Sequence, residues 1–115
     1  MTQYYQLGGK PRPIRFGYGA IMLYERATGK SILQVAQNMG SGEMQLTEII
    51  ELIYAGYLNG CRAERIQSAH TREDVCDWLD EMPQATLEQI TTQFANSFNG
   101  GKAKNTDEAT AGEKN

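Results

Sequence analysis

The segment from Glu43 to Asn59, EMQLTEIIELIYAGYLN, places the strongest constraint on what this chain can fold into. Large apolar residues recur in it at the spacing of one helical face: Leu46, Ile49, Ile50, Ile53, Tyr54, Tyr57 and Leu58. Glu48 and Glu51 fall off this stripe, and we expect them to face water. Burial of each large apolar side chain contributes roughly 1.5–3 kcal/mol, so this helix should form the centre of the core. Gly60 follows the stripe and is expected to end the helix in a left-handed conformation.

Gly56 stands in the middle of this helical segment, where glycine costs about 1 kcal/mol relative to alanine. We interpret the Ala55-Gly56 pair as a close-packing point. The backbone of the first helix is expected to approach the central helix there.

The composition is that of an ordinary soluble domain. The 115 residues are 40% hydrophobic and 22% charged, with a net charge of −3. No window approaches the ~20 apolar residues of a membrane span, and the N-terminus lacks the apolar core of a signal peptide. We therefore expect no membrane association and no secretion. The mild acidity disfavours nucleic-acid binding, and Cys61 and Cys76 are expected to be reduced thiols.

Residues 2–16 carry the signals of a β-hairpin. Gly8-Gly9 separates two segments with strand-forming side chains, and glycine supplies the positive φ angles that tight hairpin turns require. Pro11 and Pro13 cannot donate ladder hydrogen bonds, so the second strand should lie at an edge.

Four further helices are predicted around the central one. The first runs from Ala20 to Thr28 after a break at residues 17–19, and Gly29 is its expected stop. A short helix opens at Ser31 and ends at the glycine-rich residues 40–42, where Gly40 is the first turn glycine. Two later helices begin at capping-box spacings, Thr71 with Asp74 and Thr86 with Gln89, and Pro83 separates them.

These elements predict one mainly α domain over residues 1–99. A short N-terminal β-hairpin (residues 2–16) should pack on a compact bundle of about five helices. Residues 100–115 contain no large apolar side chain and are expected to form a disordered tail.

No motif in the sequence indicates catalysis, a cofactor or a metal. His70 and the two cysteines lack the paired spacing of a zinc site, and Gly17-Tyr18-Gly19 lacks the rest of a nucleotide-binding loop. Carboxylate pairs such as Glu73-Asp74 suit solvated helix faces. We therefore expect a non-enzymatic protein without cofactors.

A helix-turn-helix element over residues 32–53 is the sharpest competing interpretation. Its would-be recognition helix carries Glu43, Glu48 and Glu51 and no lysine or arginine. It would bring carboxylates to a polyanion, which opposes DNA binding.

The segment from Arg12 to Arg62 resembles the tail assembly chaperones of tailed bacteriophages and related prophage or gene-transfer particles. That family has an N-terminal strand pair, a helix with a Glu-x-x-(small or Thr)-Gly ending, a short helix and a longer helix with an Ala-Gly-aromatic phrase. The corresponding phrases here are Glu25-Arg26-Ala27-Thr28-Gly29 and Ala55-Gly56-Tyr57-Leu58. The resemblance covers about half of the expected folded chain, and its motifs are packing signatures.

The resemblance implies a chaperone that binds the long helical tape-measure protein in the host cell cytoplasm. It would keep that protein soluble and help recruit tail-tube subunits. The candidate partner-binding residues are Tyr57, Phe94 and Phe98, although the stripe with Phe94 and Phe98 could instead dock on the core. Gly29, Gly40 and Gly56 are expected to be structural. The alternative functions are another small helical protein-binding adaptor and, less favoured, a helix-turn-helix DNA-binding regulator. The chain could also form a homo-oligomer.

Overall fold

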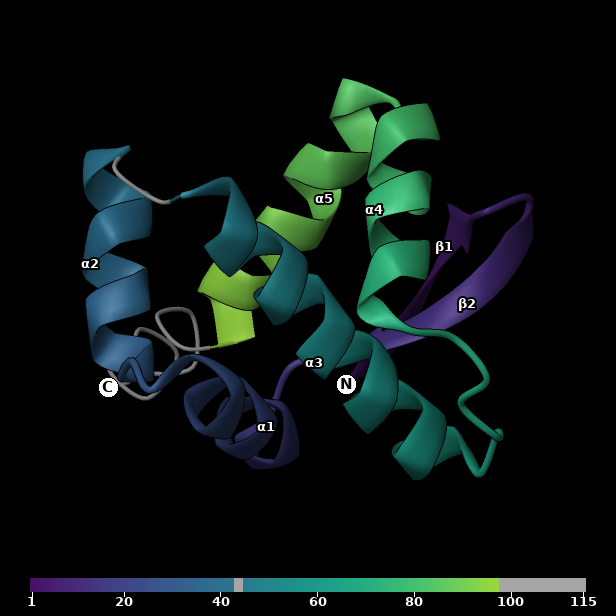
Figure 1. Cartoon of the computed structure of the whole chain (residues 1–115), viewed down its shortest axis with the longest axis horizontal. Helices are drawn as coiled ribbons and strands as arrows, with labels where there is room; N and C mark the ends of the chain where they lie inside the picture. The colour runs from purple at the N-terminus through teal and green to yellow at the C-terminus, as the bar shows by residue number, and fades with distance from the viewer. Residues whose placement is uncertain (43–44, 98–115) are drawn as a thin grey trace, which may run out of the picture.

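The computed structural model describes residues 1–42 and 45–97. Within these ranges the chain forms an N-terminal hairpin and five helices, as Figure 1 shows. The elements are β1 (Thr2–Leu7), β2 (Lys10–Arg15), α1 (Tyr18–Thr28), α2 (Ile32–Ser41), α3 (Leu46–Glu64), α4 (Arg72–Glu81) and α5 (Gln84–Ala95). The predicted fold class is confirmed. The tail expected at residues 100–115 lies outside the described residues.

The hairpin forms as predicted. Gly8 and Gly9 have φ angles of 66° and 84° and make the two-residue turn between antiparallel strands β1 and β2. Pro11 lies opposite Gln6 and Pro13 lies opposite Tyr4. The buried side chain of Gln93 on α5 accepts a hydrogen bond from the Tyr5 hydroxyl at 2.7 Å, which ties the last helix to the hairpin.

Helix α3 is longer than the sequence pattern predicted, and Gly60 does not end it. The helix continues to Glu64, and Arg65 closes it in a left-handed conformation with φ 57°. Gly60 is buried inside the helix, where a Cβ atom would lie 2.9 Å from both the carbonyl carbon and the carbonyl oxygen of Pro13. The glycine therefore serves the close approach of β2.

Gly56 is also a close-packing point, but its neighbour is the hairpin. A Cβ atom there would lie 2.7 Å from the Phe16 ring and 3.0 Å from Cγ2 of Ile14. The expectation that the backbone of the first helix approaches Gly56 was wrong. Gly56 and Gly60 are four residues apart and share one face of α3, so together they make the seat for β2 and Phe16.

The apolar core gathers side chains from both strands and all helices. The buried hydrophobic residues are Tyr5, Leu7, Ile14, Phe16, Ala20, Tyr24, Val35, Leu52, Ile53, Ala55, Tyr57, Cys61, Val75, Trp78, Ile90 and Phe94. Two residues of α3 depart from the predicted stripe. Leu46, in its first turn, is 65% exposed, whereas Glu48 is only 4% exposed. Helix α3 buries more than its apolar stripe because the hairpin and the neighbouring helices pack against several of its sides.

The predicted ends of α1 and α2 are close to those observed. Gly29 has φ 73° and donates its N–H to the Glu25 carbonyl oxygen at 2.8 Å, as a helix-terminating glycine should. Gly40 lies within α2, and Gly42 adopts the left-handed conformation with φ 77° that ends this helix. Helix α1 begins at Tyr18, so the expected break at residues 17–19 includes its first turn.

One of the two later capping boxes is present. The Thr71 hydroxyl accepts from the Asp74 N–H, and the Asp74 carboxylate accepts from the Thr71 N–H, as predicted for the start of α4. The box expected at Thr86 and Gln89 was wrong, because α5 already begins at Gln84, directly after Pro83. Proline suits a helix start since its missing N–H has no intrahelical acceptor there.

Candidate protein-binding groove

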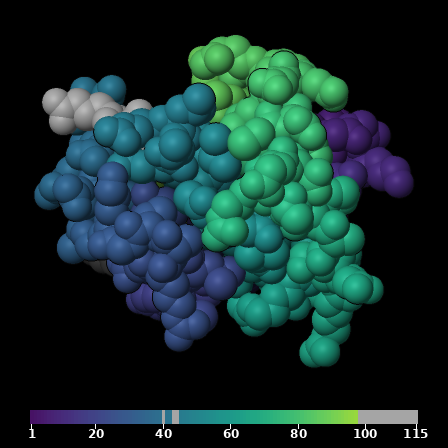
Figure 2. All heavy atoms as spheres, viewed as in Figure 1, coloured from purple at the N-terminus to yellow at the C-terminus, as the bar shows by residue number. Residues whose placement is uncertain are grey.

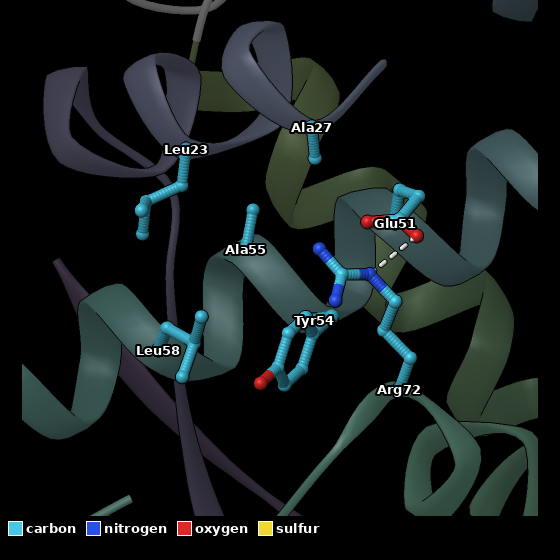
Figure 3. A pocket seen from close by; sticks show the side chains of 7 residues that line it. All are labelled: Leu23, Ala27, Glu51, Tyr54, Ala55, Leu58 and Arg72. Atoms are coloured by element: carbon cyan, nitrogen blue, oxygen red, sulfur yellow. Dashed lines mark hydrogen bonds and ion pairs between the residues drawn. The ribbon is translucent and has the colours of Figure 1, made fainter.

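A small apolar groove lies between α1 and α3, and the start of α4 covers one end of it. Figure 3 shows the side chains that line it: Leu23, Ala27, Glu51, Tyr54, Ala55, Leu58 and Arg72. The hollow measures about 50 Å³. Small-molecule sites are usually about 300–1,000 Å³, so this one has room for a side chain of a partner.

The sequence builds this groove by placing small residues where two helices meet. Ala27 on α1 and Ala55 on α3 leave space that larger side chains would fill. Leu23 lies one turn before Ala27, while Tyr54 and Leu58 lie one turn apart on α3. The result is a small hollow lined by two alanines and three larger apolar side chains, with Glu51 and Arg72 at one end.

One ion pair marks the charged end of the groove. The Arg72 Nε donates to the Glu51 Oε2 at 2.6 Å, and the Arg72 guanidinium carbon lies 5.0 Å from the centre of the Tyr54 ring. The pair is partly exposed, so it contributes little to stability. Arg72 stacks on the Tyr54 ring and holds its position, and the Arg72–Glu51 pair presents a positive and a negative group to a partner.

Glu48 and Lys30 form a second ion pair close by, between the α1–α2 connection and α3. The hydrogen bond from the Lys30 ammonium lowers the pKa of the Glu48 carboxyl, although burial acts in the opposite direction. Glu48 also accepts the N–H of Gln45 at 3.2 Å, just before α3 begins. The expectation that Glu48 faces water was therefore wrong, because Lys30 supplies a partner that allows burial.

The hollows around Lys30 are larger, at about 260 and 210 Å³, but they are open and lined mainly by polar residues. Lys30 is already paired with Glu48, and the Thr28 side chain accepts the Lys30 N–H. Polar and charged residues thus shape these two hollows, whereas five of the seven residues that line the groove are apolar.

The candidate partner-binding residues from the sequence are not at this groove. Tyr57 is 2% exposed and Phe94 is 1% exposed, so both belong to the core. The Phe94 ring meets Phe16 edge-on, with 5.4 Å between ring centres. Of the two alternatives for Phe94, docking on the core is the one observed. Phe98 lies outside the described residues.

The residues that line the groove were not identified from the sequence. Tyr54 and Leu58 belong to the predicted stripe, yet both are only partly buried at its rim. Their position at the margin of the stripe was a usable signal for surface exposure. Ala27 and Arg72 carried no such signal, since their contribution depends on how α1 and α4 pack against α3.

The molecule has one further cluster of polar and aromatic side chains. Nη1 of Arg12 lies 2.8 Å from Nε2 of His70, and Nδ1 of His70 lies 3.1 Å from the Asp74 carboxylate. The Arg12 guanidinium stacks over Trp78 at 5.1 Å, and the Tyr57 ring meets Trp78 edge-on. These groups satisfy one another and join the hairpin to α3 and α4. Over residues 1–42 and 45–97, no three His, Cys, Asp or Glu side chains could hold a metal ion together.

Helix α3 is poorly placed to serve as a DNA recognition helix. Its buried residues include Leu52, Gly60 and Cys61, which lie on different sides of the helix. A recognition helix must present a free face to a DNA groove. The groove face of α3 instead carries Glu51 beside two partly buried apolar side chains.

Comparisons with family models, with curated proteins and with solved structures give no match. In the part of the chain that the structure describes, no helix combines the length and apolarity needed to cross a membrane.

Proposed function

We propose that this chain is a non-enzymatic tail assembly chaperone of the tailed-phage type, acting in the cytoplasm of the host cell. Its role would be to bind the tape-measure protein, keep it soluble and help recruit tail-tube subunits. The observation that carries the proposal is the apolar groove between α1 and α3, with its ion pair at one end. The order of elements supports it, since a strand pair, a helix ending at Gly29, a short helix and a long helix follow one another.

The groove suits an amphipathic helix. An apolar side chain of such a helix would enter the hollow between Ala27 and Ala55, and its neighbours one turn away would contact Leu23 and Leu58. A charged residue on its flank would meet Glu51 or Arg72. The contact area is modest, so binding would be reversible, as release to tail-tube subunits requires.

Coexpression with the tape-measure protein from the same genome tests the function. We expect a soluble complex that can be isolated, and a tape-measure protein that precipitates when expressed alone. An unchanged solubility of the tape-measure protein, together with no isolable complex, would refute the proposed function.

A pair of matched substitutions tests the groove. Ala27→Arg would fill the hollow from an exposed position on α1. We expect it to weaken binding of the tape-measure protein at least roughly tenfold. Ala63→Arg places the same side chain on an exposed residue of α3 outside the groove and should bind normally. If both variants bind as the unaltered chain does, the function survives and the groove is not its site.

A small helical adaptor is the second candidate, because the same groove would accept an amphipathic helix from another protein. The genes beside this one distinguish the two. Tail-tube and tape-measure genes on either side favour the chaperone, whereas their absence favours the adaptor.

A further inference from the structure

The outer edge of β1 carries backbone groups that no described residue pairs. Proline has no N–H, so Pro11 and Pro13 must occupy the positions of β2 that do not bond to β1. The ladder therefore runs through the other pairs, in which Leu7 faces Lys10, Tyr5 faces Arg12 and Gln3 faces Ile14. It follows that the N–H and C=O groups of Thr2, Tyr4 and Gln6 point away from β2.

The corresponding edge of β2 is protected in two ways. Pro11 and Pro13 remove outward N–H groups, and Pro13 packs directly on Gly60 of α3. One residue pair further along, the Asn59 side-chain amide donates to the Arg15 carbonyl oxygen at 3.1 Å. Helix α3 thus covers the edge of β2 and satisfies part of it.

Within the described residues, strand β1 has neither prolines nor a covering helix at its outer edge. Its sequence, Thr-Gln-Tyr-Tyr-Gln-Leu, contains no proline and no charge, and Gln3, Tyr4 and Gln6 are exposed. Gln93 of α5 accepts from the Tyr5 hydroxyl and donates to the Ile14 and Met1 carbonyl oxygens, and no residue within 1–42 or 45–97 bonds the outward backbone groups of Thr2, Tyr4 and Gln6. Figure 2 shows the hairpin, in purple, projecting at the margin of the molecule beyond the green helices. Proteins usually guard such an edge, because it is ready to pair with another strand.

We propose that the outer edge of β1 pairs antiparallel with β1 of a second copy of this chain, with Tyr4 on the twofold axis. In this register Tyr4 faces Tyr4 of the other copy, and Thr2 faces Gln6. All three outward-pointing residues then exchange backbone hydrogen bonds, and the two hairpins form one four-stranded sheet.

A second copy fits this edge because the edge is complementary to itself. The strand itself is uncharged and two aromatic rings meet at the centre, while each Tyr4 hydroxyl donates to Glu64 of its own copy at 3.4 Å. A helical partner could not pair here, since its backbone groups are already bonded within the helix. The inference therefore does not rest on the proposed function. One strand pair is small beside the roughly 1,000 Å² of a stable interface, so the dimer should dissociate on dilution.

Sedimentation of the full chain across a concentration series tests the proposal, together with amide hydrogen exchange. We expect a monomer–dimer equilibrium at high concentration. The exchange of the Tyr4 and Gln6 amides should slow as concentration rises, whereas that of Gln3 and Tyr5 should not change. A chain that stays monomeric up to about 1 mM, where even weak association is populated, overturns the proposal.

Substitutions at Tyr4 test the register. Tyr4 is 49% exposed, so Tyr4→Lys should fold normally, which its circular dichroism can verify. Like charges would then face each other on the axis and weaken the dimer roughly tenfold. Tyr4→Glu should do the same, and an equal mixture of the two variants should restore association through opposite charges.

Tyr18→Lys is the matched control, because Tyr18 is 91% exposed on α1 and away from the strand edge. It should leave the equilibrium unchanged. Association that persists in Tyr4→Lys, or a mixture that fails to associate, would show that any dimer forms elsewhere or in another register.

Discussion

Gly60 and Pro13 lie so close that the backbone of β2 occupies the space of a side chain on α3. This contact fixes where the hairpin sits on the central helix. Because a strand backbone cannot turn aside as a side chain can, the position accepts glycine alone.

We expect Gly60→Ala to destabilise the fold by about 1–3 kcal/mol, the usual cost of overpacking. Without the contact, alanine would instead stabilise the helix by about 1 kcal/mol. The sign of the change in the free energy of urea unfolding therefore decides the matter. Gly56→Ala should cost less than Gly60→Ala, because its neighbours are the side chains of Phe16 and Ile14, which can shift.

Arg12→Lys should destabilise the chain by about 1–3 kcal/mol. The arginine donates Nε to the Leu7 carbonyl oxygen at 2.7 Å, reaches Nε2 of His70 with Nη1 and stacks over Trp78. The single ammonium of lysine cannot make these contacts together. Thermal unfolding followed by circular dichroism measures the effect, and an unchanged midpoint would mean that the contacts contribute nothing.

Acid should destabilise the fold through Glu48. Its pKa is lowered from 4.5 in the folded state, chiefly by the hydrogen bond from Lys30. The Glu48 carboxylate therefore takes up a proton less readily in the folded chain than in the unfolded chain. The stabilisation is present above pH 4.5 and is lost as the pH falls through the folded value.

Glu48→Gln should remove this part of the acid dependence, as measured by urea unfolding at a series of pH values. Glu81→Gln, at an exposed residue of α4, serves as the control. Identical pH profiles for the two variants would contradict the assignment to Glu48.

Alkali should destabilise the fold through Tyr57. Burial first, and then hydrogen bonding with the Cys61 thiol, raise the pKa of Tyr57 from 10.0 to about 12. The folded chain holds this proton more tightly than the unfolded chain. Stability is therefore full below pH 10 and declines as the pH rises through about 12. Tyr57→Phe should flatten this decline, and spectroscopic titration of the phenolate checks it directly.

Local signals in the sequence were enough to predict the order of the strands and helices and several of the residues at which they begin or end. Gly8-Gly9 predicted the hairpin turn, Gly29 the end of α1, and Thr71 with Asp74 the start of α4. Each of these signals acts within a few residues of its effect. For that reason it can be read without knowing how the elements pack.

The packing of α3 could not be read in the same way. Hydrophobic periodicity places Glu48 in water, and only the tertiary contact with Lys30, eighteen residues earlier, makes its burial favourable. Gly60 looks like a helix terminator until the approach of Pro13 is known. The groove also depends on tertiary packing and was not predicted, because Ala27 and Ala55 make a hollow only when their two helices meet.

Trp78 is the single tryptophan of this chain, and its ring nitrogen faces Gly8, where a Cβ atom would lie only 2.6 Å away. The ring also touches Arg12, His70 and Tyr57, so four separate parts of the chain meet around one fluorophore. Its emission spectrum is thus an intrinsic, label-free reporter of whether the hairpin is docked. Undocking would expose the indole to water and shift the emission to the red, while unfolding confined to α2 would leave it unchanged.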